Sequence, residues 1–252
     1  PPIVEFLIAN HGWRTAYRGI GLGALLISLP IVFALFKEKP DSSTATDGEV
    51  MANKVETWGL TTKDAMRTKQ FWILGAVLFL TVIVVAGLLS NFERIMTEQG
   101  FERSSIAQIA AVMGLTVIIG RLMVGALVDR FWAPGVAACF FLVATLGLLI
   151  LVGTQVTMAT ALLVAVMIGL AAGAELDLLA YLTGKYFGPA HYPAIFGLII
   201  AFFTVGAGIA PPLFGMAAQM FQGYGTMLSI SIGLLLVSIL LFLSLGRYPD
   251  EE

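Results

Sequence analysis

Charged residues are scarce in this sequence. Aspartate, glutamate, lysine and arginine make up 12% of its 252 residues, about half the share found in an average soluble domain. Hydrophobic residues make up 58%, and the mean hydropathy is +0.92. Such a chain cannot bury its apolar surface in one small aqueous core, so we expect it to lie in a lipid bilayer. The net charge of −2 gives no indication of a nucleic-acid partner.

Cysteine and histidine are also rare, which excludes several kinds of site. The single cysteine, Cys139, cannot form an intrachain disulfide, and its apolar surroundings are typical of a packing residue. His11 and His191 lie outside the apolar stretches, and the sequence contains no His-Glu-x-x-His motif or Cys/His cluster. No nucleophile–base pattern is visible either. We therefore expect no metal, no cofactor and no catalytic residues, which disfavours an intramembrane enzyme.

Long apolar stretches dominate the rest of the chain. A membrane helix needs about 20 mainly apolar residues, and isolated strands cannot satisfy their backbone groups in lipid. The alternating pattern of barrel strands is absent. The sequence therefore predicts an all-α polytopic membrane bundle of seven transmembrane helices. Their expected ranges are 19–36, 71–92, 105–127, 133–153, 158–183, 192–219 and 225–246.

One polar stretch, 37–70, interrupts this series and predicts three parts of the chain. Residues 1–36 would be a loop and one helix, residues 37–70 a linker, and residues 71–252 a bundle of six helices. The capping-box spacing of Thr61 and Asp64 predicts a short helix at the membrane interface, just before the second apolar stretch. If the linker is cytoplasmic, nine of the 14 lysines and arginines lie inside and four outside. This bias favours a cytoplasmic linker and C-terminus.

A short internal echo suggests that the chain is cut from a longer, duplicated protein. Pro1-Pro2 precedes Gly12-Trp13 and an apolar stretch, and Pro211-Pro212 precedes Gly223-Tyr224 and another. The chain also begins with proline and has no signal-peptide pattern. Duplicated halves are common in transporters. We interpret the chain as the last helix of one half, a linker and a complete second half, with the rest of the N-terminal half missing.

Several local motifs together resemble the major facilitator superfamily, and most closely its monocarboxylate transporter and oxalate/formate antiporter branch. The motifs are Gly12-Trp13-Arg14-Thr15-Ala16-Tyr17, Phe71-Trp72, the run from Gly120 to Arg130 with its Gly-x-x-x-Asp-Arg signature, Tyr186-Phe187-Gly188 and Ala194-Ile195-Phe196-Gly197. The resemblance implies twelve helices in two bundles and one solute site between them. It implies secondary transport by alternating access, in which the two bundles rock against each other.

Three charged residues lie well inside the apolar stretches, namely Arg121, Glu175 and Asp177. Such charges are costly in a bilayer and usually functional. Arg121 and Asp177 each lie eight residues before a charge at a cytoplasmic end, so both should lie roughly 12 Å inward. The guanidinium of Arg121 suits a carboxylate, and the resemblance places an arginine of the branch here. An internal ion pair or snorkelling to the surface is the alternative.

The two acidic residues are candidates for proton coupling. Glu175 and Asp177 are two positions apart and point about 200° apart on a helix, so they cannot both face one cavity. A buried carboxyl near an arginine can bind and release protons, although a structural ion pair would explain it as well. Tyr181 shares the face of Asp177 and is a candidate substrate-binding residue.

Two further groups of residues are assigned by position. The resemblance gives Gly125, Asp129 and Arg130 a role in gating at the cytoplasmic end, although ordinary helix-end charges would explain the latter two. Asn91, at the outer end of its stretch, is a candidate substrate contact at the external mouth, or simply an exposed polar residue.

Glycines and prolines within the apolar stretches predict local packing. Gly169 and Gly173 have the small-xxx-small spacing of a close helix contact. Pro211 and Pro212 should bend or break their helix.

Taken together, the sequence predicts a secondary transporter of small organic anions that is monocarboxylate-like in substrate and driven by proton symport. Stretch 192–219 lacks the lysine of oxalate-type members, which disfavours a dicarboxylate held between two cations. The apolar stretches contain two acidic residues and one basic residue, so a neutral or cationic solute remains an alternative. The spans are too apolar for a channel. We expect the bacterial inner membrane as the location.

Overall fold

The computed structural model describes residues 58–248 except 154, together with most positions between 12 and 30. The chain divides into two units, Pro1–Glu56 and Thr57–Glu252. In the first unit, every described position between 12 and 30 is helical. The end of the expected span 19–36 and the expected linker up to residue 57 lie outside the described residues. The division of the chain into three parts stays a prediction.

Six long helices form the second unit, and each is long and apolar enough to cross a membrane. They are α3 (Lys69–Glu98), α4 (Arg103–Val128), α5 (Ala133–Gly153), α6 (Met158–Phe187), α7 (Tyr192–Met220) and α8 (Gly225–Leu243). The described residues contain no strand. The predicted all-α membrane bundle is therefore confirmed. The described residues contain six helices of membrane length.

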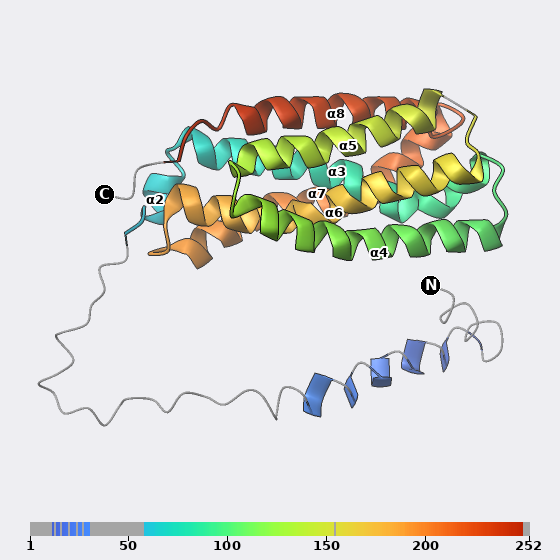
Figure 1. The fold of residues 1–252 in the computed structure, drawn as a ribbon, viewed down its shortest axis with the longest axis horizontal. Helices are drawn as coiled ribbons and strands as arrows, with labels where there is room; N and C mark the ends of the chain where they lie inside the picture. The colour runs from blue at the N-terminus through green and yellow to red at the C-terminus, as the bar shows by residue number, and fades with distance from the viewer. Residues whose placement is uncertain are drawn as a thin grey trace, which may run out of the picture. The chain divides into compact units, whose positions relative to one another are not determined.

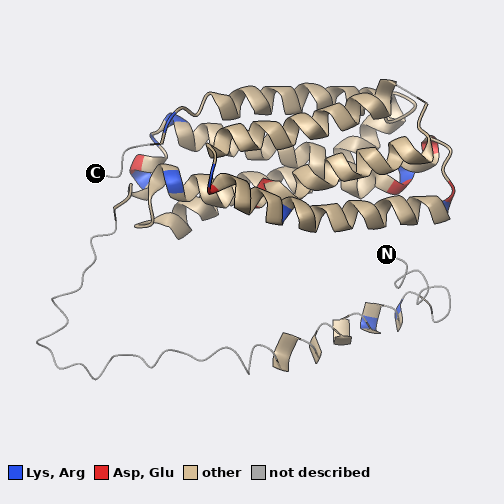
Figure 2. Ribbon diagram, viewed as in Figure 1, with Lys and Arg blue, Asp and Glu red and all other residues tan. Residues whose placement is uncertain are grey.

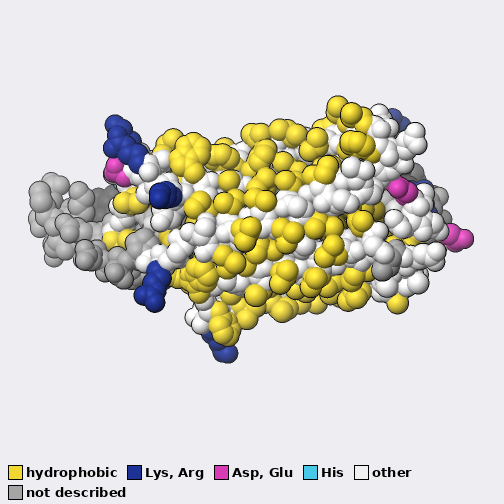
Figure 3. All heavy atoms as spheres, turned by 90° about the horizontal axis from the view of Figure 1, so that it is seen from above, with side chains coloured by type: hydrophobic (Ala, Val, Ile, Leu, Met, Phe, Trp, Pro, Cys, Tyr) yellow, Lys and Arg dark blue, Asp and Glu magenta, His cyan; other side chains and the backbone are white. Residues whose placement is uncertain are grey.

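Successive helices run in opposite directions along the bundle (Figure 1). The main contacts pair α4 with α6 and α3 with α7, while α5 packs against both α6 and α8. Charged residues gather mainly at the two ends (Figure 2), and the face seen in Figure 3 is covered largely with apolar side chains. This banding is what a bilayer requires of a protein that spans it.

Burial is unequal among the helices, and this inequality positions the site. The most apolar window of α3 is 61% buried, whereas those of α4 and α7 are only 28% and 22% buried. Arg121 and the apolar Leu115, Ile118 and Leu122 are exposed on α4. Two helices of this bundle thus keep faces that the described residues do not cover.

A glycine seam brings α4 and α6 into close contact. A Cβ at Gly120 would lie 2.5 Å from the carbonyl oxygen of Leu170, and a Cβ at Gly173 would collide with the carbonyl oxygen of Val117. A Cβ at Gly169 would likewise collide with Thr116. Small residues permit such approaches between membrane helices. The two helices therefore touch backbone to backbone along this line.

A short elbow precedes α3. Helix α2 (Thr62–Ala65) begins after Thr61, whose side chain accepts a hydrogen bond from the backbone N–H of Asp64. The Trp72 indole N–H donates to the carbonyl oxygen of Met66 at 2.9 Å and ties the elbow to α3. The capping-box spacing in the sequence thus corresponds to a real cap, although the helix has only four residues.

Tyrosines close the end of the bundle that carries α2, which we call the α2 end. The backbone N–H of Ala133, at the start of α5, donates to the hydroxyl of Tyr248 at 2.9 Å. The hydroxyl of Tyr186 donates to the carbonyl oxygen of Gly246. Burial raises the pKa of Tyr248 above its ordinary value, so the phenol stays neutral while it caps α5.

Helix α7 continues through Pro211 and Pro212, so of the predicted bend or break, a break does not occur and a bend stays a prediction. Each proline removes one backbone donor. Here the side-chain amide of Asn91 on α3 donates to the carbonyl oxygen of Pro211 at 3.4 Å and holds α7 against α3.

Candidate functional site

Arg121 lies in the last third of α4, on the helix face that is least covered. Its side chain is exposed, and its guanidinium forms no hydrogen bond or ion pair with any other described residue. The ion pair with Glu175 or Asp177 that the sequence left open is therefore not formed within the described part of the chain. The side chain keeps all its donors available, which is what recognition of an anion requires.

A groove of about 260 Å³ runs between α4 and α6 next to this position. Gly125 lies one helical turn after Arg121, so the two residues share a face of α4. The groove brings together four residues that the sequence assigned to separate roles. Its lining consists of Val124, Gly125, Val128, Asp129, Asp177 and Tyr181.

The glycine seam explains why Asp177 and Tyr181 reach this groove. Gly169, Gly173, Asp177 and Tyr181 follow one another at intervals of four, so they lie along one face of α6. The first two contact α4 directly, and the next two line the groove. The Tyr181 hydroxyl donates to the carbonyl oxygen of Val128 at 3.0 Å, while the Asp177 carboxylate is exposed and has no hydrogen-bond partner among the described residues.

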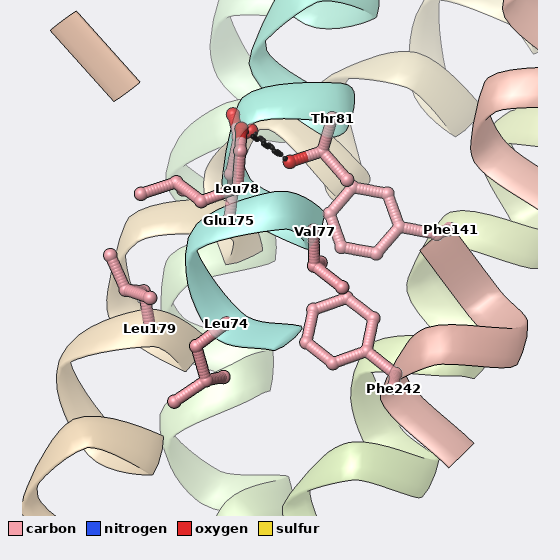
Figure 4. Close-up of a pocket in the computed structure, with 8 residues that line it drawn as sticks. All are labelled: Leu74, Val77, Leu78, Thr81, Phe141, Glu175, Leu179 and Phe242. Carbon is pink, nitrogen blue, oxygen red and sulfur yellow. Dashed lines mark hydrogen bonds between the residues drawn. The ribbon is translucent and has the colours of Figure 1, made fainter. Parts of the chain in front are cut away.

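Glu175 lies in the interior of the bundle rather than in the groove (Figure 4). Its residue is only 6% exposed. The hydroxyl of Thr81 on α3 donates to Glu175 Oε1 at 2.6 Å. The remaining residues around this pair are apolar and come from four helices: Leu74, Val77, Leu78, Phe141, Leu179 and Phe242. Glu175 and Asp177 therefore occupy different environments on opposite sides of α6.

Thr81 was not among the site residues predicted from the sequence. The one feature that could have indicated it is a hydroxyl in the middle of the apolar stretch 71–92. Helical periodicity alone could not show which neighbour it meets, because Glu175 is 94 positions further along the chain. The contact depends on the packing of α3 beside α6, which a single sequence does not specify.

Asn91 is buried at the end of the bundle opposite α2. Besides its bond to Pro211, its amide donates to the carbonyl oxygen of Gly87 at 3.0 Å, and its carbonyl oxygen accepts from the Tyr224 hydroxyl at 3.1 Å. Nearby, the Glu98 carboxylate accepts from the backbone N–H of Tyr224. These bonds join α3 to α7 and α8. The role of Asn91 in substrate binding stays a prediction.

Two residues predicted to act in gating, Asp129 and Arg130, lie at the α2 end of α4. Asp129 is the C-cap of α4 and lines the groove, and Arg130 follows it as an exposed residue. Neither side chain has a hydrogen-bond or ion-pair partner among the described residues. Both side chains are therefore available to bind a part of the protein outside the described residues. Their gating role stays a prediction.

Comparison with known proteins agrees with this architecture. The sequence profile of the Major Facilitator Superfamily matches residues 1–198. A 3-(3-hydroxy-phenyl)propionate transporter of Escherichia coli (strain K12) is 25% identical over 243 residues, which is 96% of this chain. The chain spans 58% of the length of that relative. It therefore belongs to the Major Facilitator Superfamily, a family of membrane transporters and not of enzymes.

Proposed function

We propose that the protein is a proton-coupled secondary transporter of small organic anions, in which Arg121 binds the carboxylate of the solute. The observation that carries this proposal is the position of the guanidinium, which is exposed on the least covered part of α4 and has no described partner. A cation inside a membrane helix is costly unless it faces a water-filled cavity or a counter-charge. An anionic solute would supply that counter-charge in each transport cycle.

The name of the relative supports a carboxylate as the solute. The substrate in that name, 3-(3-hydroxy-phenyl)propionate, carries one carboxylate at the end of a propionate chain that is attached to a phenol ring. Arginine pairs with a carboxylate through two parallel hydrogen bonds. Tyr181, in the adjacent groove, would contribute an aromatic wall and a hydroxyl. We infer a monocarboxylate as the substrate class for this chain.

The uncovered faces of α4 and α7 support a second bundle as the partner of this one. We propose that the complete transporter places the other half of the protein against these faces, which would enclose Arg121 in a cavity at mid-membrane. Rocking of the halves would then expose the cavity to each side in turn. The excess of basic residues at the α2 end favours the cytoplasmic side for the linker and the C-terminus, in a bacterial inner membrane.

Counterflow tests this function directly. Full-length protein in vesicles preloaded with 3-(3-hydroxyphenyl)propionate is expected to accumulate the labelled compound transiently, because a carrier exchanges solute across the membrane. The amide of the same compound should not compete, since it lacks the charge that Arg121 would bind. Absence of counterflow would contradict a carrier, and equal competition by the amide would contradict recognition of the anion.

A second candidate function is transport of a cationic solute. Two carboxylates, Asp129 and Asp177, line the groove between α4 and α6, and neither has a described partner. They could bind an amine at the same place. The corresponding aromatic amine, used as a competitor in the same counterflow assay, distinguishes the two: inhibition by the amine alone would favour the cation.

A further inference from the structure

A second buried polar site lies away from the groove. Four helices surround Glu175 and Thr81, which is 1% exposed. The space beside the pair measures about 10 Å³, roughly the volume in which one water molecule can be held. Every other residue lining it is apolar, so the facing side chains of α3, α5, α6 and α8 bring no titratable or charged group to Glu175. The described residues provide it with no counter-ion.

The hydroxyl of Thr81 has two acceptors within reach. It lies 2.6 Å from Glu175 Oε1 and 3.2 Å from the carbonyl oxygen of Leu78, but it carries only one hydrogen. When Glu175 is a carboxylate, Thr81 can donate to it. When Glu175 is a carboxylic acid, its own O–H can donate to Thr81, and Thr81 can turn its hydrogen to Leu78. The Thr81 hydroxyl thus has a hydrogen-bond acceptor in both protonation states of the acid, but it gives the carboxylate only one hydrogen bond and no counter-charge.

We propose that Glu175 and Thr81 form the proton-binding site of the transporter, separate from the surface that binds the solute. This inference rests on the proposed function and deepens it. On one side of the membrane a hydronium ion gives a proton to one Glu175 oxygen, so one O–H bond of the hydronium breaks and the carboxyl O–H forms. On the other side the carboxyl O–H breaks and a water molecule takes the proton to become hydronium. Thr81 is a positioning residue that turns its hydroxyl to suit either state.

Helix α6 connects the two sites mechanically. Glu175 points to the interior on one side of the helix, while Asp177 faces the groove on the other. A carboxylate without a counter-charge in apolar surroundings is stabilised by water or a new partner, and a shift of α6 relative to α3 would admit either. The backbone contact at Gly169 and Gly173 would transmit such a shift to α4 and therefore to Arg121.

The experiment compares two transport modes of the full-length protein in vesicles. Accumulation driven by a pH gradient requires proton movement, whereas counterflow at equal pH requires only solute exchange. We expect Glu175→Gln to reduce accumulation by about tenfold or more and to keep counterflow within about twofold of wild type. Glutamine preserves the size of glutamate and keeps one oxygen that can accept from Thr81, but it cannot bind the proton.

Thr81 supplies a second, independent test. Thr81→Val removes the hydroxyl and keeps the shape, so we expect the pH midpoint of accumulation to shift. Thr81→Ser retains the hydroxyl and should restore the midpoint. If Glu175→Gln does not fold, this pair of variants decides, because an unchanged midpoint in Thr81→Val would overturn the proposal.

Other outcomes are equally decisive. Normal accumulation by Glu175→Gln would overturn the proposal, and so would a parallel loss of accumulation and counterflow in a folded variant, because the residue would then serve solute movement or packing. Failure of counterflow in the wild-type protein would instead contradict the proposed function itself.

Discussion

An Arg121→Lys variant of the full-length protein is expected to lose most of its uptake of a monocarboxylate. Lysine keeps the positive charge but replaces a planar fork of donors with a compact point charge. Hydrogen bonds to charged groups contribute about 1.5–3 kcal/mol, and each 1.4 kcal/mol corresponds to about tenfold in binding. Loss of one such bond should therefore reduce kcat/KM by about 10- to 150-fold. The effect requires that Arg121 contacts the solute.

The matched control is the same substitution at Arg94. This residue is exposed near the end of α3 opposite α2, whereas the groove extends to Asp129 at the α2 end of α4. Initial rates of labelled solute uptake, normalised to the amount of folded transporter, give the comparison. We expect Arg94→Lys to remain close to wild type. Unchanged uptake by Arg121→Lys would remove the guanidinium from the solute site.

A Gly173→Val variant should destabilise the bundle. A Cβ at this position would collide with the carbonyl oxygen of Val117 and lie 3.1 Å from the backbone nitrogen of Arg121. Because both groups belong to the backbone of α4, no side-chain rotation can relieve the collision, and the helices must separate. Overpacking of this kind costs about 1–3 kcal/mol, occasionally more.

Thermal unfolding of the purified protein in detergent measures this cost. Gly114→Val on α4 is the control, because no atom lies within 4 Å of a Cβ built there. We expect the Tm of Gly173→Val to fall by several degrees while Gly114→Val changes little. Equal Tm values for the two variants would show that the seam tolerates a separation that the packing of α4 on α6 does not predict.

Hydropathy alone predicted most of the fold. Helix α5 spans Ala133–Gly153, as expected from the sequence, and α7 differs from its expected range by one residue. The agreement follows from the bilayer, which requires about 20 apolar residues for each crossing and so marks every helix in the composition. Helix α3 extends six residues beyond its expected end, because polar residues can continue a helix into the headgroup region.

The candidate site was only partly visible in the sequence. Arg121, Glu175 and Asp177 stand out because charges are rare in membrane spans, and helical geometry already separated the two acids. Their neighbours depend on which helices touch. Asn91 resembled an exposed helix-end residue, yet the structure buries it against Tyr224 and Pro211. In the sequence, a polar residue near a helix end looks the same whether the folded protein buries or exposes it.

We propose that the face of α4 bearing Arg121 lines a water-filled route in the complete transporter. Gly125, one turn from Arg121, is exposed and has space for a side chain. The measurement is the labelling of Gly125→Cys, in a full-length background without other cysteines, by a charged thiol reagent that cannot cross lipid. The control is Leu142→Cys on α5, where the exposed leucine should contact lipid.

We predict that the charged reagent labels Gly125→Cys and that a monocarboxylate substrate slows the labelling. Leu142→Cys should react only with a lipid-soluble maleimide. If Gly125→Cys also reacts only with the lipid-soluble reagent, this face of α4 lies against the bilayer, and Arg121 cannot bind a solute in an aqueous cavity.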